Sequence, residues 1–476
     1  MKKRILSCLM ALALCLTLLP TAALADEPAG PANGEPKQEQ ENQQEQPTEE
    51  ETISPMPLGT PAPAAEGMES STPHEHCLCG AAHKNIGDQH TEEESTTFTA
   101  WTNDRAKEQY NNEKKTASNS LPKTGGSYYL TEDVTLTATW SPADGTTLCL
   151  NGYSIISKSN NYGIKIDGGV AFTLCDCNGS KNTYRFEEDT YKLWKLDKSG
   201  SHEVTGGILT SGGSGVFINN GTFNMYGGTI VGNRGNSNKG GGVFINFNGS
   251  NNKFNMYGGA IVGNSVSGDS TTDGGGGVYV GGNSNTFNMY GGEISGNATT
   301  KHASGGGVNV NDKGTFNMTG GVIGGEGKGN TSSWGGGGVY IDEQCVFTMS
   351  GSARITDNKE TYGAGGGVQV SGGTFTMSGD AEIVNNQTTG TNGSGGGGVS
   401  VSKNSAFTMS GNAAITGNSS RGNGGGVSVR GNTLIVSGNV RITGNTKGNE
   451  ANNVYLGQYN DDPMPIITIA KGGLTE

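Results

Sequence analysis

The chain has 476 residues, of which 83 are glycine and only 32% are hydrophobic, and its mean hydropathy is −0.47. Taken alone, this composition is typical of low-complexity or disordered chains. The net charge is −13, and without the basic residues Lys2, Lys3 and Arg4 it becomes −16, because 28 basic residues then stand against 44 acidic ones. We therefore expect no nucleic acid partner, since phosphate binding needs a basic stripe.

Residues 1–25 predict a secretory signal peptide. A basic start is followed by an apolar run from Ile5 to Leu19, and Pro20 and Ala23 precede the expected cleavage after Ala25. The apolar run is shorter than the ~20 residues that cross a bilayer as a helix. We therefore expect a secreted, extracellular protein, either free or associated with the cell surface, with no membrane span once the signal is removed.

Residues 26–73 predict a disordered acidic linker. The segment consists largely of Glu, Gln, Pro, Ala and Gly, and it cannot bury enough apolar area to offset the entropy of ordering. Its expected role is to hold the folded part away from a surface.

Residues 74–97 form a segment rich in cysteine and histidine. Thiolate and imidazole at this density suit tetrahedral zinc, with Cys77, Cys79, His83 and one of His74 or His76 as ligands. One residue between the cysteines is fewer than structural zinc sites use, and in an extended chain it turns the two thiols to opposite sides. A Cys77–Cys79 disulfide and a polar hinge therefore stay open beside zinc, and no cofactor is expected to be required.

Residues 98–205 predict a β-rich N-terminal cap with the first irregular coils. Alternating patterns indicate strands, residues 182–201 suggest an inserted hairpin, and the sortase-like letters of residues 121–125 lie mid-chain, where they indicate a turn. The alternation places Cys149, Cys175 and Cys177 on the outward side, so a Cys149–Cys175 bridge is one of the open pairings.

Residues 206–476 are a repeat with three apolar positions per unit. A valine that opens an alternating pair recurs at Val216, Val243, Val278, Val308, Val339, Val368, Val399, Val427 and Val454. A second position holds Phe223, Phe254, Phe287, Phe316, Phe347, Phe375 and Phe407, then Leu434 and Ile467. A third holds Ile230, Ile261, Ile294, Ile323, Ile355, Ile383, Ile415 and Ile442. The short spacing from the second to the third position is nearly constant, whereas the return to the next valine varies.

These spacings predict an all-β fold, a right-handed parallel β-helix with three short strands per coil. Stacked coils place like residues over one another at the ~4.8 Å separation of paired strands, which buries an apolar column that a single coil could not bury. Glycine runs before seven of these valines, from Val243 to Val427, predict tight turns with positive φ. An asparagine three residues after most of the isoleucines predicts a stacked amide ladder, and Ile323, followed by Gly324 and Gly325, departs from this rule.

The Gly-Gly-Gly-Val-x-Val and Phe-x-Met-x-Gly repeats resemble those of secreted right-handed parallel β-helix surface proteins of Gram-positive bacteria, within the pectate-lyase-like superfamily. The likeness spans residues 74–476 and implies the fold. It says little about activity, because this fold carries lyases, hydrolases and adhesins alike.

Two functions follow as expectations. The first is a noncatalytic, adhesin-like module that binds a glycan or a host or bacterial surface protein through outward aromatic side chains, namely Phe217, Phe244, Tyr279, Tyr340, Tyr226, Tyr257 and Tyr290. Ordinary cross-strand stacking is the alternative role for these rings. The second function is a polysaccharide lyase or glycoside hydrolase. We expect no catalytic residues, since acidic pairs such as Asp342 and Glu343 look isolated and no outward column stacks acids on adjacent coils.

Overall fold

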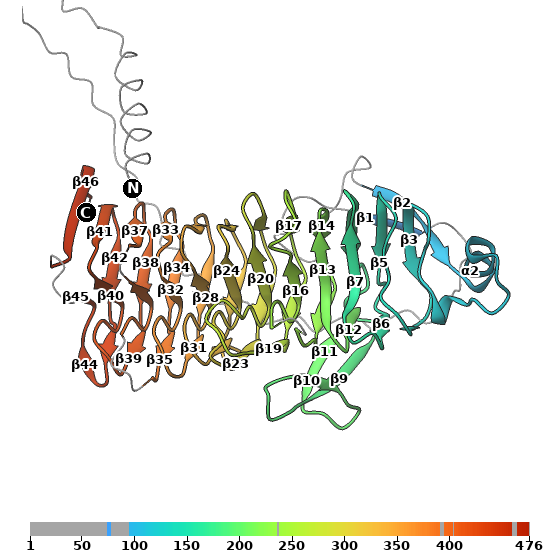
Figure 1. Ribbon diagram of the computed structural model, residues 1–476, viewed down its shortest axis with the longest axis horizontal. Helices are drawn as coiled ribbons and strands as arrows, with labels where there is room; N and C mark the ends of the chain where they lie inside the picture. Colours follow the sequence, from blue (N-terminus) through green and yellow to red (C-terminus); the bar gives the residue numbers. More distant parts are fainter. Residues whose placement is uncertain are drawn as a thin grey trace, which may run out of the picture. The chain divides into compact units, whose positions relative to one another are not determined.

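The computed structural model describes residues 74–77, 95–235, 238–390, 395–402, 404–458 and 464–475. The predicted signal peptide and acidic linker lie outside the described residues, as does most of the Cys/His-rich segment. The described part is a parallel β-helix whose coils stack along one axis, as Figure 1 shows. The predicted fold class is confirmed.

Three long sheets run along this axis, and we name each after its inward residue. The Phe sheet contains β1 (His74–Cys77), β2 (Ser95–Trp101), β3 (Gly126–Leu130), β5 (Thr146–Cys149), β8 (Ala171–Cys175), β14 (Thr222–Met225), β17 (Lys253–Met256), β21 (Thr286–Met289), β25 (Thr315–Met318), β29 (Val346–Met349), β33 (Thr374–Met377), β37 (Ala406–Met409), β41 (Thr433–Gly438) and β46 (Ile466–Leu474). The Ile sheet contains β4 (Val134–Leu136), β6 (Ser154–Ser157), β12 (Ile208–Ser211), β15 (Thr229–Val231), β18 (Ala260–Val262), β22 (Glu293–Ser295), β26 (Val322–Gly324), β30 (Arg354–Thr356), β34 (Glu382–Val384), β38 (Ala414–Thr416) and β42 (Arg441–Thr443). The Val sheet contains β7 (Tyr162–Asp167), β13 (Ser214–Asn219), β16 (Val243–Ile245), β20 (Val278–Gly281), β24 (Val308–Asn311), β28 (Val339–Ile341), β32 (Val368–Val370), β36 (Val399–Val401), β40 (Val427–Arg430) and β45 (Val454–Gly457).

Like residues stack on like residues in the core, as predicted. Phe254 pairs with Phe287 across neighbouring strands, and their ring centroids lie 4.7 Å apart with an interplanar angle of 6°. In the Val sheet, Val243 pairs with Val278 in the same register. All four side chains are fully buried. Burial of one such phenylalanine contributes about 1.5–3 kcal/mol, so repetition along the axis stabilises every coil in the same way.

From Ser265 onward each coil has a fourth strand, so the prediction of three strands per coil is wrong for this part of the chain. The short sheet contains β19 (Ser265–Gly268), β23 (Ala298–Lys301), β27 (Thr331–Ser332), β31 (Lys359–Glu360), β35 (Gln387–Thr388), β39 (Ser419–Ser420), β43 (Thr446–Lys447) and β44 (Glu450–Ala451). Its strands are polar and mostly two residues long, so no alternating apolar pattern marks them in the sequence. They lie in the stretch whose length varies from coil to coil.

The predicted amide ladder is present, and it is buried. Its members are Asn233, Asn264, Asn297, Asn330, Asn358, Asn386, Asn418 and Asn445. Asn297 Oδ1 accepts hydrogen bonds from Asn264 N at 3.0 Å and from Asn264 Nδ2 at 2.9 Å. Asn297 Nδ2 donates to Ile261 O at 2.8 Å and to Asn330 Oδ1 at 2.9 Å. Where the sequence departs from the rule, residues 324–329 form an insertion and Asn330 restores the ladder.

The glycine runs combine two different requirements. In the run 274–277, Gly274 and Gly275 have positive φ, as predicted, and Gly276 and Gly277 do not. A Cβ on Gly276 would lie 2.6 Å from the carbonyl oxygen of Ala298 in the short sheet. A Cβ on Gly277 would lie 2.7 Å from Gly307 O and 2.9 Å from Ile294 Cγ2. The last two glycines are therefore required because backbone and core side chains approach them closely, and not because of their φ angles.

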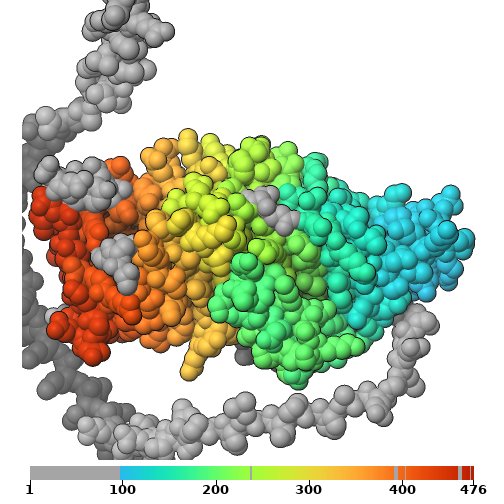
Figure 2. All heavy atoms as spheres, turned by 60° about the horizontal axis from the view of Figure 1, so that its bottom comes forward, coloured from blue at the N-terminus to red at the C-terminus, as the bar shows by residue number. Residues whose placement is uncertain are grey.

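Two irregular elements lie at the N-terminal end. The helix α2 (Asn103–Tyr110), which the sequence analysis did not predict, begins after Thr102, whose side chain accepts from Arg105 N, and it is followed by the 3₁₀ turn η2 (Ala117–Asn119). The predicted hairpin is a three-stranded antiparallel lobe, visible in Figure 1 and Figure 2, of β9 (Thr183–Glu188), β10 (Trp194–Leu196) and β11 (His202–Thr205). Trp194 of this lobe packs in a buried cluster with Ile208 and Val231, which lie in the Ile sheet. The lobe therefore covers part of the outer face of that sheet.

Candidate functional site: the outer face of the Phe sheet

The outer face of the Phe sheet carries two rows of stacked polar and aromatic side chains. The amide row consists of Asn224, Asn255, Asn288 and Asn317, each half-buried, with Nδ2-to-Oδ1 distances of 2.9, 2.9 and 3.0 Å between successive members. These positions alternate with the buried phenylalanine and methionine, so they point away from the core. Because neighbouring strands pair in register, the outward asparagine of one strand lies directly beside that of the next, and together they form a continuous amide row along the axis.

The tyrosine ladder, Tyr226, Tyr257 and Tyr290, runs beside the amide row. The ring centroids of Tyr226 and Tyr257 lie 4.5 Å apart, those of Tyr257 and Tyr290 lie 4.9 Å apart, and both interplanar angles are 13°. Tyr226 and Tyr257 are half-buried and Tyr290 is 41% exposed. Partial burial, together with the neighbouring tyrosine, raises the pKa of Tyr226 and of Tyr257. These two hydroxyls therefore stay protonated at neutral pH, and they hydrogen bond to each other.

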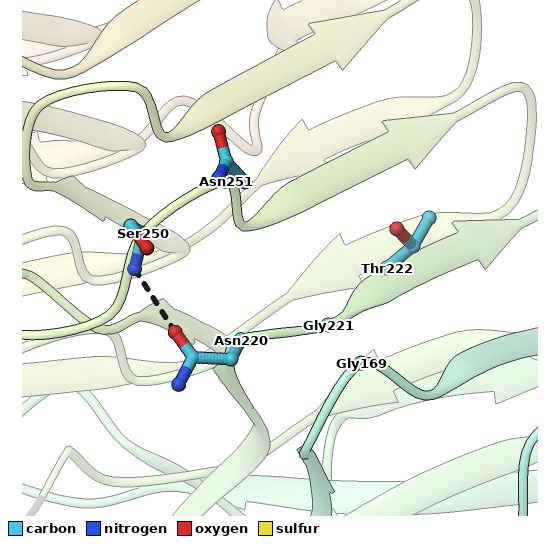
Figure 3. Close-up of a pocket in the computed structure, with 6 residues that line it drawn as sticks. All are labelled: Gly169, Asn220, Gly221, Thr222, Ser250 and Asn251. Atoms are coloured by element: carbon cyan, nitrogen blue, oxygen red, sulfur yellow. Dashed lines mark hydrogen bonds between the residues drawn. The ribbon is translucent and has the colours of Figure 1, made fainter.

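A polar hollow of about 370 Å³ lies at one edge of this face, where the chain turns from the Val sheet into the Phe sheet. Figure 3 shows the residues that line it, Gly169, Asn220, Gly221, Thr222, Ser250 and Asn251. Ser250 N donates to Asn220 Oδ1 at 3.0 Å, which joins the turns of two neighbouring coils. Thr222 begins β14, so the hollow lies at the start of a strand that carries a member of the amide row and is followed directly by Tyr226.

The outward column of the Val sheet is covered, so Phe217, Phe244, Tyr279 and Tyr340 point outward as predicted but are not exposed. Their side chains are 8%, 3%, 0% and 3% exposed, respectively. The turn at Gly240 crosses this face, since a Cβ there would lie 2.7 Å from Phe244 Cβ, and Lys239 Nζ lies 5.1 Å from the ring centroid of Tyr279. The return loops of the coils therefore form a second layer over the column. Binding by these four residues stays untested, whereas the three tyrosines of the Phe sheet remain accessible.

Carboxylates gather beside the covered column, and the sequence analysis missed this. Tyr279 Oη donates to Asp312 Oδ2 at 3.1 Å, and Tyr340 Oη donates to Asp342 Oδ1 at 3.3 Å. Burial raises the pKa of Asp342, and the neighbouring charges of Asp312 and Glu343 add to the shift. The expectation that no acids stack on adjacent coils is therefore wrong. Aligning the repeats on their valines places Asp312 and Glu343 in one column, so the sequence does hold this signal.

A second aromatic row lies on the short sheet and was also missed. Trp334 stacks on Tyr362 with ring centroids 5.0 Å apart, and His302 meets Trp334 edge-on at 4.9 Å. Tyr362 is 47% exposed. Beside it, Glu360 is fully buried, and its Oε1 accepts from Tyr362 N at 2.6 Å and from Gly363 N. Trp334 and Tyr362 each follow their ladder asparagine by four residues, which is the spacing that would have revealed the row.

The zinc prediction is not tested. The backbone of His74, His76 and Cys77 lies in β1, which pairs antiparallel with β2, whereas Cys79 and His83 lie outside the described residues. Among the described residues, no three His, Cys, Asp or Glu side chains are grouped so that they could hold a metal ion.

Comparisons with known proteins add no functional assignment. The chain matches no protein-family model, no curated protein and no solved structure. Within the part of the chain that the structure describes, no helix is both long and apolar enough to cross a bilayer.

Proposed function

We propose that this protein is a secreted or cell-surface, noncatalytic module that binds an extended glycan along the outer face of its Phe sheet. The observation that carries the proposal is the tyrosine ladder, in which stacked and partly exposed rings run parallel to a continuous amide row. Aromatic faces pack against the apolar faces of sugar rings, and amides and phenol groups exchange hydrogen bonds with sugar hydroxyls.

The repeat geometry favours a polymer over a small ligand. Four successive coils present an asparagine at the same place, and the first three of them also present a tyrosine, so a chain that lies along the axis meets the same groups repeatedly. Contacts that are weak singly then combine through effective concentration. The net charge of −16 without the three basic residues of the expected signal peptide favours neutral or cationic glycans over polyuronates, because a negative surface repels a negative polymer.

The test is glycan binding by the full chain, measured by titration against a neutral β-glucan, a chitin oligomer and a polygalacturonate. The double substitution Tyr257→Ser and Tyr290→Ser removes two rings, and at about 0.5–1.5 kcal/mol per ring contact it should weaken binding roughly 5- to 150-fold. Tyr191→Ser, at a 51% exposed tyrosine of the hairpin lobe, is the matched control and should leave binding unchanged.

Unchanged glycan affinity in the Tyr257/Tyr290 double variant would overturn the site. A loss caused instead by Tyr362→Ser would move binding to the short sheet. A protein that binds no glycan and captures a purified surface protein through the same tyrosines would replace the glycan with a protein partner.

A polysaccharide-acting enzyme is the second candidate, and the carboxylates beside Tyr279 and Tyr340 are the observation that favours it. Asp312 and Asp342 come from adjacent coils, and burial raises the pKa of Asp342, which is the direction that a general acid requires. Incubation with pectin and with neutral glycans should then release reducing ends or unsaturated products. That release should stop in Asp342→Asn and persist in Asp380→Asn, a control at an exposed aspartate.

A further inference from the structure

Three cysteines lie together at the N-terminal end of the Phe sheet. Cys149 ends β5 and Cys175 ends β8, and the two are paired directly across the sheet. Both side chains are buried, whereas Cys177, which follows β8, is exposed. These residues share the outward side of the sheet with Tyr226, which packs against the buried cluster of Phe98, Cys149 and Cys175.

The sulfur of Cys149 is placed against Cys177. The two Sγ atoms lie 3.3 Å apart, and the backbone N–H of Cys177 donates to Cys149 Sγ at 3.4 Å. Cys175 also hydrogen bonds to Cys149, and its thiol lies 3.7 Å from Leu148 O. An in-register parallel pair also holds its Cβ atoms near the strand separation of ~4.8 Å, which is longer than the ~3.5–4.5 Å of a disulfide. A Cys149–Cys175 bridge would therefore require the strands to be pulled together, whereas Cys177 follows β8 outside the paired strands and its sulfur already lies 3.3 Å from that of Cys149.

We infer that Cys149 and Cys177 form a disulfide in the exported protein and that Cys175 stays a thiol. A low-molecular-weight disulfide, R–S–S–R, is the oxidant. The exposed Cys177 thiolate attacks it, releases one RS⁻ and becomes a mixed disulfide. Cys149, as thiolate, then attacks Cys177 Sγ and displaces the second RS⁻. The two protein protons end on the two RSH molecules, so two thiols are oxidised and one R–S–S–R is reduced.

The bridge would join the second and third coils of the cap on their outward side. It would hold the cluster on which Tyr226 rests, and hence the first ring of the tyrosine ladder. The hydrogen bond with Cys149 raises the pKa of Cys177, so the thiolate is scarce at neutral pH and the exchange should be slow.

Peptide mapping of the full secreted chain can distinguish the pairings, because Asp176 lies between the two candidate partners. After treatment with glutathione disulfide and alkylation, cleavage before aspartate gives peptide 144–166 with Cys149, peptide 167–175 with Cys175 and a peptide starting at Asp176 with Cys177. We expect peptide 144–166 to be linked to the peptide that starts at Asp176, and peptide 167–175 to be alkylated.

Peptide mapping of two variants tests the same pairing independently of the native chain. Cys175→Ser should retain the linked pair, whereas Cys177→Ser should show Cys149 fully alkylated with unchanged circular dichroism. A link from Cys149 to Cys175, a link from Cys149 to Cys77 or Cys79, or complete alkylation of Cys149 after oxidation of the native chain would each overturn the inference.

Discussion

Replacing Asn297 with alanine tests the buried amide ladder directly. The side chain is fully buried and takes part in four hydrogen bonds, two at Oδ1 and two at Nδ2. In the wild-type chain, the backbone N–H and one side-chain amide hydrogen of Asn264 both donate to Asn297 Oδ1. Alanine removes this acceptor and leaves both hydrogens without a partner. A buried donor without a partner costs about 1–3 kcal/mol, so the free energy of unfolding should fall by roughly 2–6 kcal/mol.

Asn288→Ala is the matched control, because it removes the same side chain from the amide row of the outer face. Asn288 also hydrogen bonds to asparagines of both neighbouring coils, but it is only half-buried and water can replace those partners. The expected cost is about 0.5–1 kcal/mol.

Urea denaturation followed by far-ultraviolet circular dichroism measures both variants against the parent chain. Equal denaturant slopes would show that the same amount of structure unfolds in each, which matters in a repeat fold where ends can unfold first. If Asn297→Ala lost no more stability than Asn288→Ala, the ladder would not be what holds successive coils together.

Three further outcomes follow from burial and close approach. Gly277→Ala should destabilise the fold by about 3 kcal/mol despite an ordinary φ, because the added Cβ would lie 2.7 Å from a backbone oxygen. Gly179→Ala should be neutral in the same urea assay, because no atom lies within 4 Å of the position of its Cβ. Burial raises the pKa of Glu360 to about 7, so the folded state keeps a proton that the unfolded state loses above its pKa of about 4.5. Stability should therefore be highest below pH 4.5 and fall by about 3 kcal/mol as the pH rises through 7, and Glu360→Gln should flatten this profile in melting curves. Tyr279→Ser should lower the unfolding free energy by about 3–5 kcal/mol, and an unchanged midpoint would contradict the covered column.

The core of the β-helix could be predicted because each inward residue is repeated at a nearly fixed spacing. Phe254 and Phe287 stack because both the apolar column and the backbone ladder require like residues in register. Asn330 shows the limit of this reasoning. It lies seven residues after Ile323 instead of three, so the sequence spacing did not identify it. In the structure it accepts a hydrogen bond from Asn297 and donates one to Asn358, which places it in the ladder.

The candidate site was harder to predict. Strand alternation shows which side chains point away from the core, but it does not show which of these are exposed to solvent. Tyr279 and Tyr257 both point away from the core, yet loops cover the first and leave the second accessible. Those loops differ in length from coil to coil and carry no periodic signal, so their path could not be deduced. The contact of Tyr279 with Asp312 in the next coil was hidden for the same reason.

The ladder asparagines stay in register even though the number of residues between them varies. Successive members are 31, 33, 33, 28, 28, 32 and 27 residues apart along the chain, yet the amides meet at 2.8 to 3.0 Å every time. Segments between two such asparagines can therefore grow or shrink without changing the axial advance per turn. Excising residues 298–330 would join Asn297 to Thr331 and shorten the molecule by one unit while every remaining layer kept its partner above and below. Adding or removing repeats would therefore change the axial length of such a protein in steps of one strand separation, and the surface loops can change independently of that length.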